Sequence, residues 1–310
     1  MTIMKGDFFM KDTIGKIISV VLIFIIAFFA ISPLEEAQSG DGKRWMAGLD
    51  DSTQINQLSI PGSHDSGATH SIGDLAGKCQ SLAIEDQLNI GVRFLDIRLQ
   101  LVGDDFRIVH SFVDQGTDFS DTLEDIVEFI ENNPTEFLFI SIKKDADSKN
   151  PVGDFTTLLE NELCKYEIIS DSTELPKTVG EARGKIYIIS RYENSTMGIP
   201  AYNGWQDSTS FELGGLYVQD NYAVDSTDIK IADIKATFEV SASDSYGLVL
   251  NFTSCYLTSG FPPTYAATPA KEINPWIRQE LHYRSDPTGI LVCDFVTSEL
   301  VKSIWEVNFR

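Results

Sequence analysis

Short apolar runs alternate with amphipathic helical patterns along most of this chain of 310 residues. The runs are rich in β-branched and aromatic residues and mostly continuous rather than alternating, which is typical of strands buried on both faces. They fall at residues 57–60, 94–101, 106–112, 136–143, 185–192, 215–219, 246–253 and 289–295. The pattern predicts a largely parallel sheet with helices between its strands.

Amphipathic segments separate many of these runs. The clearest, DTLEDIVEFIENNP, carries four apolar side chains at helical spacing: Leu123, Ile126, Val127 and Ile130. Ser120 or Asp121 is expected to cap this helix, and Pro134 to stop it. Residues 155–166 and 272–283 have similar spacing, so we expect helices there as well.

Strands and helices that alternate over about 270 residues are typical of either a (β/α) barrel or an open doubly wound sheet. The open sheet would favour a glycine-rich phosphate loop after its first strand, and neither GxGxxG nor GxxxxGK[ST] occurs. A barrel is therefore favoured. No linker, charge block or repeat interrupts residues 40–310, so we expect a single domain there.

The N-terminal segment has a different character. Three lysines precede an apolar run at 17–31 that contains Ser19, and Ser32 and Pro33 follow it. A basic stretch followed by an apolar one is the layout of a secretory signal peptide. The run is shorter than the roughly 20 residues of a spanning helix. We therefore expect residues 1–32 to direct secretion, the alternative being a retained membrane anchor through residues 14–32.

The net charge of −22 bears on possible partners. So acidic a chain does not bind nucleic acid through its bulk surface and is not attracted to anionic lipid, so any membrane contact must be local and apolar. The cysteines are widely separated and form no CxxC pair: Cys79, Cys164, Cys255 and Cys293. This spacing argues against a zinc knuckle or a thioredoxin-type site, and leaves disulfides and buried free thiols as open alternatives.

Nearly every apolar run carries or ends in ionisable or polar residues, and parallel barrel strands bring their C-terminal ends to one mouth. These residues are His64, Asp65, Asp96, Arg98, His110, Lys143, Lys144, Asp145, Arg191, Tyr192, Asp220, Tyr222 and Asp294. A single histidine at a strand end is ordinarily a turn residue. Two of the four histidines lie at such ends with carboxylates available, which indicates an acid and base pair working near neutral pH. We assign no role to His70 or His282.

Other chemistries lack their motifs. The chain has no GxSxG elbow, no HExxH and no histidine cluster with metal-ligand spacing. Two histidines, an arginine, a lysine and several carboxylates at one mouth suit a reaction at a phosphoryl centre, which needs a base, an acid and cations.

Eight motifs carry a family resemblance. LSIPGSHDSG, VRFLDIRL, IVHS, FISIKKD, IISRY, YVQDNY, LNFTS and LVCDF occur in that order between about residues 57 and 295. They resemble the successive motifs of the secreted bacterial phosphatidylinositol-specific phospholipase C family. The resemblance implies an α/β fold, a distorted (β/α)8 TIM barrel forming one catalytic domain. It also implies attack of the inositol 2-hydroxyl on phosphorus, which releases diacylglycerol and inositol 1,2-cyclic phosphate.

The resemblance also implies roles for individual residues. His64 matches the general base, and Asp294 the carboxylate that orients it. His110 matches the general acid with Asp65 as its partner, and Arg98 matches the cation on the phosphoryl oxygens.

The inositol site is carried over in the same way. Lys143, Arg191 and Asp220 match residues that hold inositol hydroxyls, and Tyr222 resembles the aromatic that stacks on the ring. Calcium-dependent relatives have an acidic ligand where Arg98 stands, so we expect neither a metal nor another cofactor.

Two details accompany this expectation. Asp96 is interpreted as the salt-bridge partner of Arg98. Asp145 stands where better-known members have a glutamate. The segment between Asp65 and Asp86 is shorter and lacks tryptophan, whereas those members use an exposed apolar helix there to dock on lipid.

The implied partners are phosphatidylinositol in membranes and, through the same headgroup, glycosylphosphatidylinositol-anchored proteins; these residues would serve both. We expect a monomer that contacts membranes peripherally. The loop 259–270 is a candidate for insertion into the headgroup layer through Phe261 and Tyr265, the alternative being a loop packed on the barrel.

Two rival functions stay open at this point. One is a metal-dependent phosphodiesterase on the same kind of barrel, acting on glycerophosphodiesters or sphingolipids. The other is an inositol-headgroup binding protein without turnover.

Overall fold

The computed structural model describes residues 42–71, 77–111, 113–243, 245–259 and 264–310. The expected signal or anchor segment, residues 1–32, and Phe261 lie outside these ranges. Within the described ranges, no helix combines the length and the apolar character that crossing a membrane requires.

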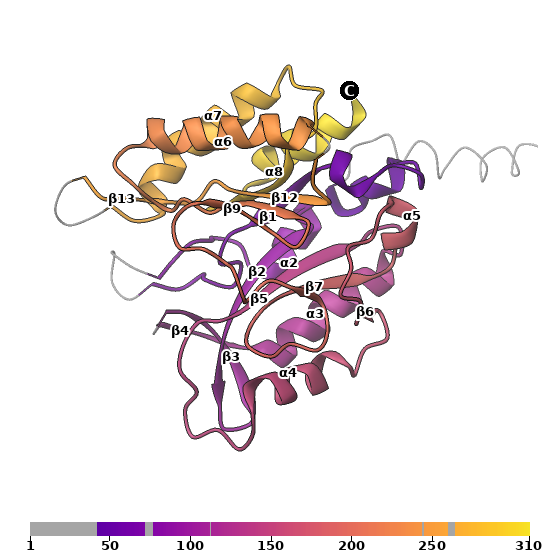
Figure 1. The fold of residues 1–310 in the computed structure, drawn as a ribbon, viewed down its shortest axis with the longest axis vertical. Coiled ribbons are helices and arrows are strands. Elements are labelled where there is room, and N and C mark those ends of the chain that lie inside the picture. Colours follow the sequence, from indigo (N-terminus) through magenta and orange to yellow (C-terminus); the bar gives the residue numbers. More distant parts are fainter. Residues whose placement is uncertain (1–41, 72–76, 112, 244, 260–263) are drawn as a thin grey trace, which may run out of the picture. The chain divides into compact units, whose positions relative to one another are not determined.

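A curved sheet of mainly parallel strands forms the centre of the domain (Figure 1). Its hydrogen-bonded order is β6-β7-β5-β2-β1-β14-β12-β10-β9, and β8 pairs with β7. Strand β9 (Ser210–Leu213) pairs antiparallel with β10. The parallel strands are β1 (Ser59–Ser63), β2 (Phe94–Val102), β5 (Leu138–Lys144), β6 (Ile169–Ser170), β7 (Ile186–Arg191), β8 (Ile199–Pro200), β10 (Leu216–Gln219), β12 (Leu248–Phe252) and β14 (Gly289–Cys293). This is the predicted distorted α/β barrel. Among the described strands no ladder joins β8 to β9 or β10, so the sheet is curled but open there.

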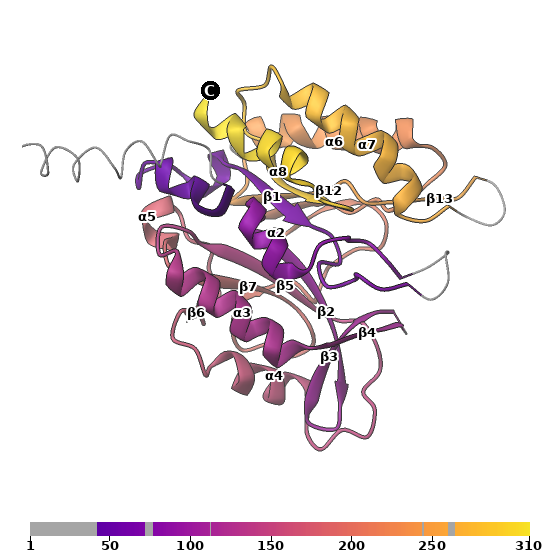
Figure 2. The same ribbon diagram turned by 180° about the vertical axis from the view of Figure 1, so that it is seen from behind.

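Helices cover the outside of this sheet. They are α2 (Ile84–Ile90), α3 (Phe119–Asn132), α4 (Phe155–Leu163), α5 (Val179–Ala182), α6 (Thr227–Ala242), α7 (Ala267–Leu281) and α8 (Ser298–Trp305). Both views show α6, α7 and α8 together beside β1 and β12, with α2, α3 and α4 beside β2, β5 and β7 (Figures 1 and 2). Strands β1, β12 and β14 are buried at every position, which explains why their sequences are continuously apolar.

Helix α3 has the predicted apolar face but a different start. Leu123, Ile126, Val127 and Ile130 are all buried, as expected. The helix begins at Phe119, and its N-cap is Asp118 rather than either of the two predicted residues. Phe119 is fully buried, so packing draws the first turn at least two residues further back than the capping pattern suggests.

The apolar run at 106–112 is not a parallel barrel strand, and that expectation was wrong. It forms β3 (Asp105–His110), which pairs antiparallel with β2, and β4 (Val113–Asp118) continues the hairpin. Only Gly103 and Asp104 separate β2 from β3, and Gly103 adopts a φ of 68°. So short a connection cannot hold a crossover helix, and it reverses the chain instead. The reversal places His110, the last residue of β3, beside the barrel mouth.

A buried ion pair supports the opposite end of β2. Nη2 of Arg93 lies 2.8 Å from Oε2 of Glu136, and neither side chain is exposed. Arg93 also donates to the carbonyl of Lys43 at 2.6 Å, which ties the short helix η1 (Gly42–Gly48) to the barrel. Its Nη1 donates to the carbonyls of Leu88 and Val92, so each nitrogen of the guanidinium has a hydrogen-bond acceptor, as a buried charge requires.

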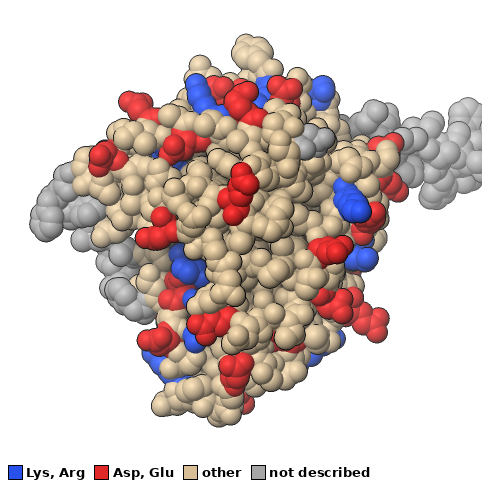
Figure 3. Space-filling view, viewed as in Figure 1, with Lys and Arg blue, Asp and Glu red and all other residues tan. Residues whose placement is uncertain are grey.

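The cysteines are all free thiols, which settles the alternatives left open by the sequence. Cys79, Cys255 and Cys293 are buried, whereas Cys164 is exposed. On the face drawn in Figure 3, acidic side chains are spread widely and outnumber basic ones, in keeping with the net charge.

Candidate active site

The site begins where β1 ends. His64 and Asp65 follow Ser63, and the backbone of His64 continues the β1–β14 ladder by donating to the carbonyl of Cys293 at 2.9 Å. Asp65 then adopts a φ of 44°, in the left-handed region that aspartate tolerates better than most residues. This turn sends the two neighbouring side chains in different directions.

His64 and Asp294 form the first close pair. Nδ1 of His64 lies 2.8 Å from Oδ1 of Asp294, which directly follows β14 and is almost fully buried. Nη2 of Arg98 approaches the other ring nitrogen, Nε2, to 2.8 Å. A guanidinium can only donate, so Nε2 accepts and Nδ1 carries the proton that Asp294 binds. Burial lowers the pKa of His64, but the charge and hydrogen bond of Asp294 outweigh it, and the net shift is upward.

Arg98 joins this pair to two buried carboxylates. Its Nη2 lies 3.1 Å from Oδ2 of Asp96, and its Nη1 lies 3.3 Å from Oδ2 of Asp65. Asp96 is therefore the salt-bridge partner that was expected. Burial lowers the pKa of the guanidinium, but the two carboxylates outweigh it and raise the pKa well above its usual value. Burial raises the pKa of Asp96, yet Arg98 and Arg191 hold it well below the usual range.

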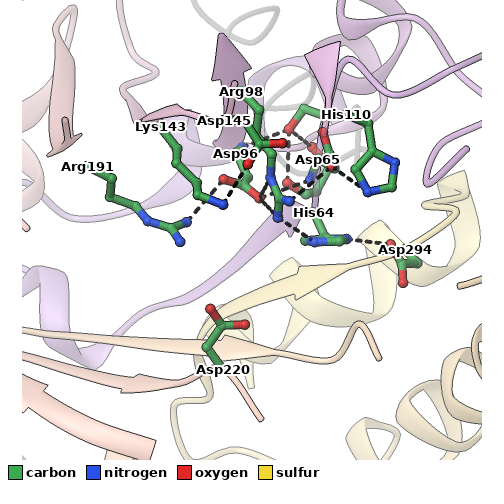
Figure 4. Close-up of polar contacts among 12 residues, drawn as sticks. His64, Asp65, Asp96, Arg98, His110, Lys143, Asp145, Arg191, Asp220 and Asp294 are labelled. Carbon is green, nitrogen blue, oxygen red and sulfur yellow. Dashed lines mark hydrogen bonds and ion pairs between the residues drawn. The ribbon is translucent and has the colours of Figure 1, made fainter. Parts of the chain in front are cut away.

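Asp65 and His110 form the second pair. Nε2 of His110, at the end of β3, lies 3.5 Å from Oδ2 of Asp65. Asp65 is fully buried, and burial raises its pKa. Because the chain reverses after β2, the end of β3 brings His110 to Asp65, and both histidines lie on the same side of Arg98 (Figure 4).

Lys143 and Asp145 occupy the end of β5. Nζ of Lys143 donates to Oδ1 of Asp145 at 2.6 Å, and the backbone N–H of Ser111 donates to Oδ2 at 2.7 Å. Asp145 therefore links β5 to the residue directly after His110. Burial raises the pKa of Asp145, but the charges of Arg98 and Lys143 outweigh it and the net shift is downward.

Arg191 and Asp220 lie on either side of Trp205. The guanidinium of Arg191 stacks on the Trp205 ring at 3.6 Å from its centroid, and its Nη1 lies 3.4 Å from Oδ1 of Asp96. The indole Nε1 of Trp205 donates to Oδ2 of Asp220 at 3.1 Å. Burial lowers the pKa of Arg191 despite the charge of Asp96. One aromatic ring thus fixes a cation from β7 and a carboxylate from the end of β10.

Tyr222 is the predicted site residue that the structure leaves apart. Its hydroxyl donates to Asp207, and its ring lies 6.0 Å from that of Tyr256. The hydrogen bond to Asp207 raises the pKa of Tyr222 to about 12. Asp220 acts on the Tyr222 hydroxyl through its charge, but within the part of the chain that the structure describes no hydrogen bond or ion pair joins Tyr222 to the other predicted site residues.

The remaining predicted residues gather at one mouth (Figure 4). Arg98 and Asp96 lie in the middle, with Lys143 and Arg191 on one side and the two histidine–aspartate pairs on the other. Asp220, which directly follows β10, lies apart from these polar contacts (Figure 4).

Sequence reasoning missed three supporting residues. Trp205 lies in a loop with no periodicity to mark it. Gln80 donates from Nε2 to the carbonyls of His64 and Cys293, at 2.8 and 2.9 Å, and so holds the ends of β1 and β14 together. Lys230 on α6 is fully buried and donates to Gln219 Oε1 and to the carbonyl of Asn221, at 2.9 and 2.7 Å. Gln80 is uncharged and Lys230 lies on a helix, so neither fits the pattern of ionisable residues at strand ends.

Two sets of side chains could hold a metal ion in the described part of the chain. One comprises His64, Cys79 and Asp294, and the other Asp65, Cys79 and His110; in each set the ligand atoms lie within 4.8 Å of one another. Thiol and imidazole ligands suit zinc, whereas calcium and magnesium prefer oxygen.

The structure thus combines a barrel-like α/β fold with two histidine–aspartate pairs at one mouth, and comparisons with known proteins define its class further. Residues 54–192 match the family model described as phosphatidylinositol-specific phospholipase C, X domain. The chain is 26% identical over 96% of its length to the 1-phosphatidylinositol phosphodiesterase of Listeria monocytogenes, of which it covers 98%. It is 28% identical to the protein of that name from Staphylococcus aureus, over 90% of this chain and 91% of the relative.

A solved structure gives the same result. A double mutant of the phosphatidylinositol-specific phospholipase C from Staphylococcus aureus superposes with a TM-score of 0.74 and 27% identity, over 86% of this chain and 97% of that one. These similarities to phosphatidylinositol-specific phospholipases C confirm the resemblance that the motifs of the chain carry.

Proposed function

We propose that this protein cleaves phosphatidylinositol by acid–base catalysis without a metal ion, giving diacylglycerol and inositol 1,2-cyclic phosphate. The observation that carries the mechanism is the chain of contacts from Asp294 through His64 and Arg98 to Asp65 and His110. The named relatives are phosphodiesterases of 1-phosphatidylinositol, and they support the substrate class.

His64 is the base in this scheme. Asp294 accepts a hydrogen bond from the Nδ1–H group, so the lone pair of Nε2 faces the mouth. There Nε2 takes the proton of the inositol 2-hydroxyl. Asp294 then stabilises the imidazolium that forms, in the way a carboxylate supports histidine in other acid–base enzymes. The 2-hydroxyl oxygen forms the new bond to phosphorus and closes the cyclic phosphate.

Arg98 stabilises the phosphoryl oxygens. In the free protein its Nη2 donates to Nε2 of His64. A phosphate oxygen is a stronger, charged acceptor, so substrate draws the guanidinium away and releases the Nε2 lone pair. The same movement that binds phosphate therefore frees the base.

His110 is the acid that protonates the leaving diacylglycerol oxygen. It contacts Asp65, whereas His64 contacts Asp294, so two separate imidazoles can serve the attacking and the leaving oxygen of an in-line displacement. Asp65 stabilises the protonated imidazole before the proton is transferred.

The inositol ring is held by the other predicted residues. Lys143 and Arg191 supply donors and Asp220 an acceptor, and Tyr222 stacks on the ring. Stacking requires Tyr222 to turn from the position in which it contacts Asp207. Trp205 holds Arg191 and Asp220 in fixed relation, which helps select a polyol headgroup over choline or ethanolamine.

Arg98 also supports metal independence. Its charge lies 3.1 to 3.3 Å from carboxylate oxygens of Asp96 and Asp65, the groups that would otherwise be available to a catalytic calcium ion. A fixed guanidinium beside phosphorus can stabilise developing charge in the role that a metal plays elsewhere.

Other expectations belong to the same proposal. Secretion follows from the basic and apolar layout of residues 1–32, and peripheral membrane contact from the lipid substrate. Free phosphatidylinositol is the proposed substrate. Anchors of glycosylphosphatidylinositol type present the same headgroup, so they are a second substrate to compare with phosphatidylinositol in a cleavage assay.

Vesicles of defined composition test this proposal. We expect the protein to release inositol cyclic phosphate from phosphatidylinositol vesicles and nothing from phosphatidylcholine vesicles. His64→Ala and His110→Ala should each lower the rate by about 10²–10⁴-fold. Release from both lipids alike, or full activity in both variants, contradicts the assignment.

A further inference from the structure

The thiol of Cys79 lies beside both histidine–aspartate pairs. One ligand atom each from Cys79, Asp65 and His110 lies within 4.8 Å of the others, and the same holds for Cys79 with His64 and Asp294. Cys79 is only 2% exposed and takes no part in the mechanism proposed above.

The backbone fixes the position of this thiol. The N–H of Cys79 donates to the carbonyl of Ala68 at 2.9 Å, and the carbonyl of Cys79 accepts from the N–H of Phe295 at 2.8 Å. The next residue, Gln80, bridges the ends of β1 and β14. The sulfur is therefore held at the mouth by the same elements that position the two histidines.

One of the two sets has unused ligand atoms. Both carboxylate oxygens of Asp65 are buried and accept no hydrogen bond, and Nδ1 of His110 is also buried without a partner. The nearest cationic atoms to Asp65 are at ion-pair distances, 3.3 Å to Arg98 and 3.5 Å to His110. His64 and Asp294 already satisfy each other at 2.8 Å, so Asp65 and His110 have the greater capacity for a new partner.

The charges around the thiol favour a cation. The ionised groups that act on Cys79 are the carboxylates of Asp294, Asp65 and Asp96, against the one guanidinium of Arg98. Arg98 is itself engaged by Asp96 through both Nη2 and Nε, at 3.1 and 3.3 Å. The surroundings are thus net negative, which favours a divalent cation over an anion.

We propose that Asp65, Cys79 and His110 form an inhibitory binding site for a thiophilic divalent cation of the zinc type. Carboxylate, thiolate and imidazole are all zinc ligands, and water completes a tetrahedral set. Zinc binds such atoms at about 2.0–2.3 Å, so modest side-chain rotations close the set. Binding displaces the thiol proton to solvent, and sulfur and nitrogen lone pairs then coordinate the ion.

The inhibitory consequence rests on the proposed function, whereas the binding itself does not. A cation on His110 prevents this imidazole from carrying the proton to the leaving group. It also removes Asp65 as the partner of the acid. Catalysis would therefore be metal-independent yet sensitive to zinc.

Direct titration tests the binding. Zn²⁺ is titrated into the metal-free full chain by calorimetry, and Co²⁺ serves as a spectroscopic probe because a thiolate bound to cobalt gives a charge-transfer absorption band. We expect one tight site with this band in wild type. Cys79→Ala should lose the band and weaken zinc binding by more than the roughly 10–100-fold that loss of an outer partner costs.

Cys164→Ser is the matched control, because Cys164 is the exposed free cysteine on α4's C-terminal end. It should bind both ions as wild type does. His110→Gln provides a second ligand variant if Cys79→Ala does not fold, as judged by circular dichroism, and it should weaken zinc binding too. A wild type without a tight site, or tight binding that survives the ligand substitution in a folded variant, overturns the proposal.

Measurements of lipid cleavage distinguish failure of the zinc site from failure of the proposed function. Wild type should lose cleavage of phosphatidylinositol on addition of Zn²⁺ and regain it with chelator, while Cys79→Ala should cleave with or without zinc. Zinc binding without any lipid cleavage would refute the proposed function alone. Cleavage without zinc binding would refute the inference alone.

Discussion

Nη2 of Arg98 lies 2.8 Å from Nε2 of His64, and Nη1 of the same guanidinium lies 3.3 Å from Oδ2 of Asp65. One side chain thus contacts a member of each histidine–aspartate pair. The two histidines come from chain segments that run in opposite directions, since His64 follows β1 and His110 ends the reversed strand β3. Arg98 is the group through which they are coupled.

Arg98→Lys should lower kcat for phosphatidylinositol by about 10²–10³-fold, the loss expected for one missing donor to a developing oxyanion. A lysine ammonium keeps the charge but cannot reach His64, Asp65 and Asp96 together, because it lacks the planar fork. Steady-state kinetics on vesicles measures this loss. Activity within a few fold of wild type would show that charge alone is sufficient.

Asp294→Asn should move the pH dependence of cleavage as well as its rate. Asp294 raises the pKa of His64, so the acid limb of kcat/KM in wild type should lie above the ordinary histidine value of about 6.5. The base must be unprotonated, and activity therefore falls as the pH drops through this raised pKa. Loss of the carboxylate should shift the limb to lower pH. An unchanged acid limb in the variant would show that Asp294 does not control the pKa of the base.

His110→Ala should be rescued by a better leaving group. Diacylglycerol leaves as a poor alkoxide and needs a proton, whereas a nitrophenyl ester of inositol phosphate leaves without one. We expect the variant to lose about 10²–10⁴-fold on lipid and much less on the nitrophenyl substrate. His64→Ala serves as the control, since loss of the base should impair both substrates equally.

Trp205→Phe should weaken headgroup binding through Asp220. The variant keeps an aromatic face for Arg191 but removes the Nε1 donor to Asp220, and a hydrogen bond to a charged group is worth about 1.5–3 kcal/mol. KM for a soluble inositol substrate should rise more than kcat falls. Trp205→Leu, which also removes the stacking surface, should be worse. Equal effects of the two variants would argue against a role for the indole N–H.

Arg93→Met tests the stability of the fold without touching the site. It leaves Glu136 buried and unpaired, which should cost about 3–5 kcal/mol in the free energy of unfolding. Urea denaturation measures the loss. Replacement of both residues by apolar ones should cost less than the single change, because no buried charge is then left alone.

Much of the site could be predicted because strand ends are marked by abrupt changes from apolar to ionisable residues. His64, Arg98, Lys143, Arg191 and Asp294 all lie at such changes and at the mouth. His110 was predicted at the mouth as the end of a parallel strand, but β3 is antiparallel to β2. An apolar run does not reveal strand direction, and only the two-residue connection before β3 shows that the chain reverses there.

Other features depend on packing that no local pattern encodes. Trp205 reaches Arg191 and Asp220 from a loop, and Cys79 reaches the histidines from a segment without regular structure. Tyr222 matches its family motif, yet its hydroxyl turns to Asp207. Motif position fixes where a residue stands along the chain, whereas the direction of its side chain follows from neighbours that are distant in sequence.

The most direct test of acid–base cleavage without metal is phosphorus NMR of phosphatidylinositol vesicles treated with the protein in excess chelator. The mechanism predicts that inositol 1,2-cyclic phosphate appears first and at an undiminished rate, and that His64→Ala abolishes it. A product that forms only after calcium or magnesium is restored, or inositol 1-phosphate without a cyclic precursor, would contradict the mechanism.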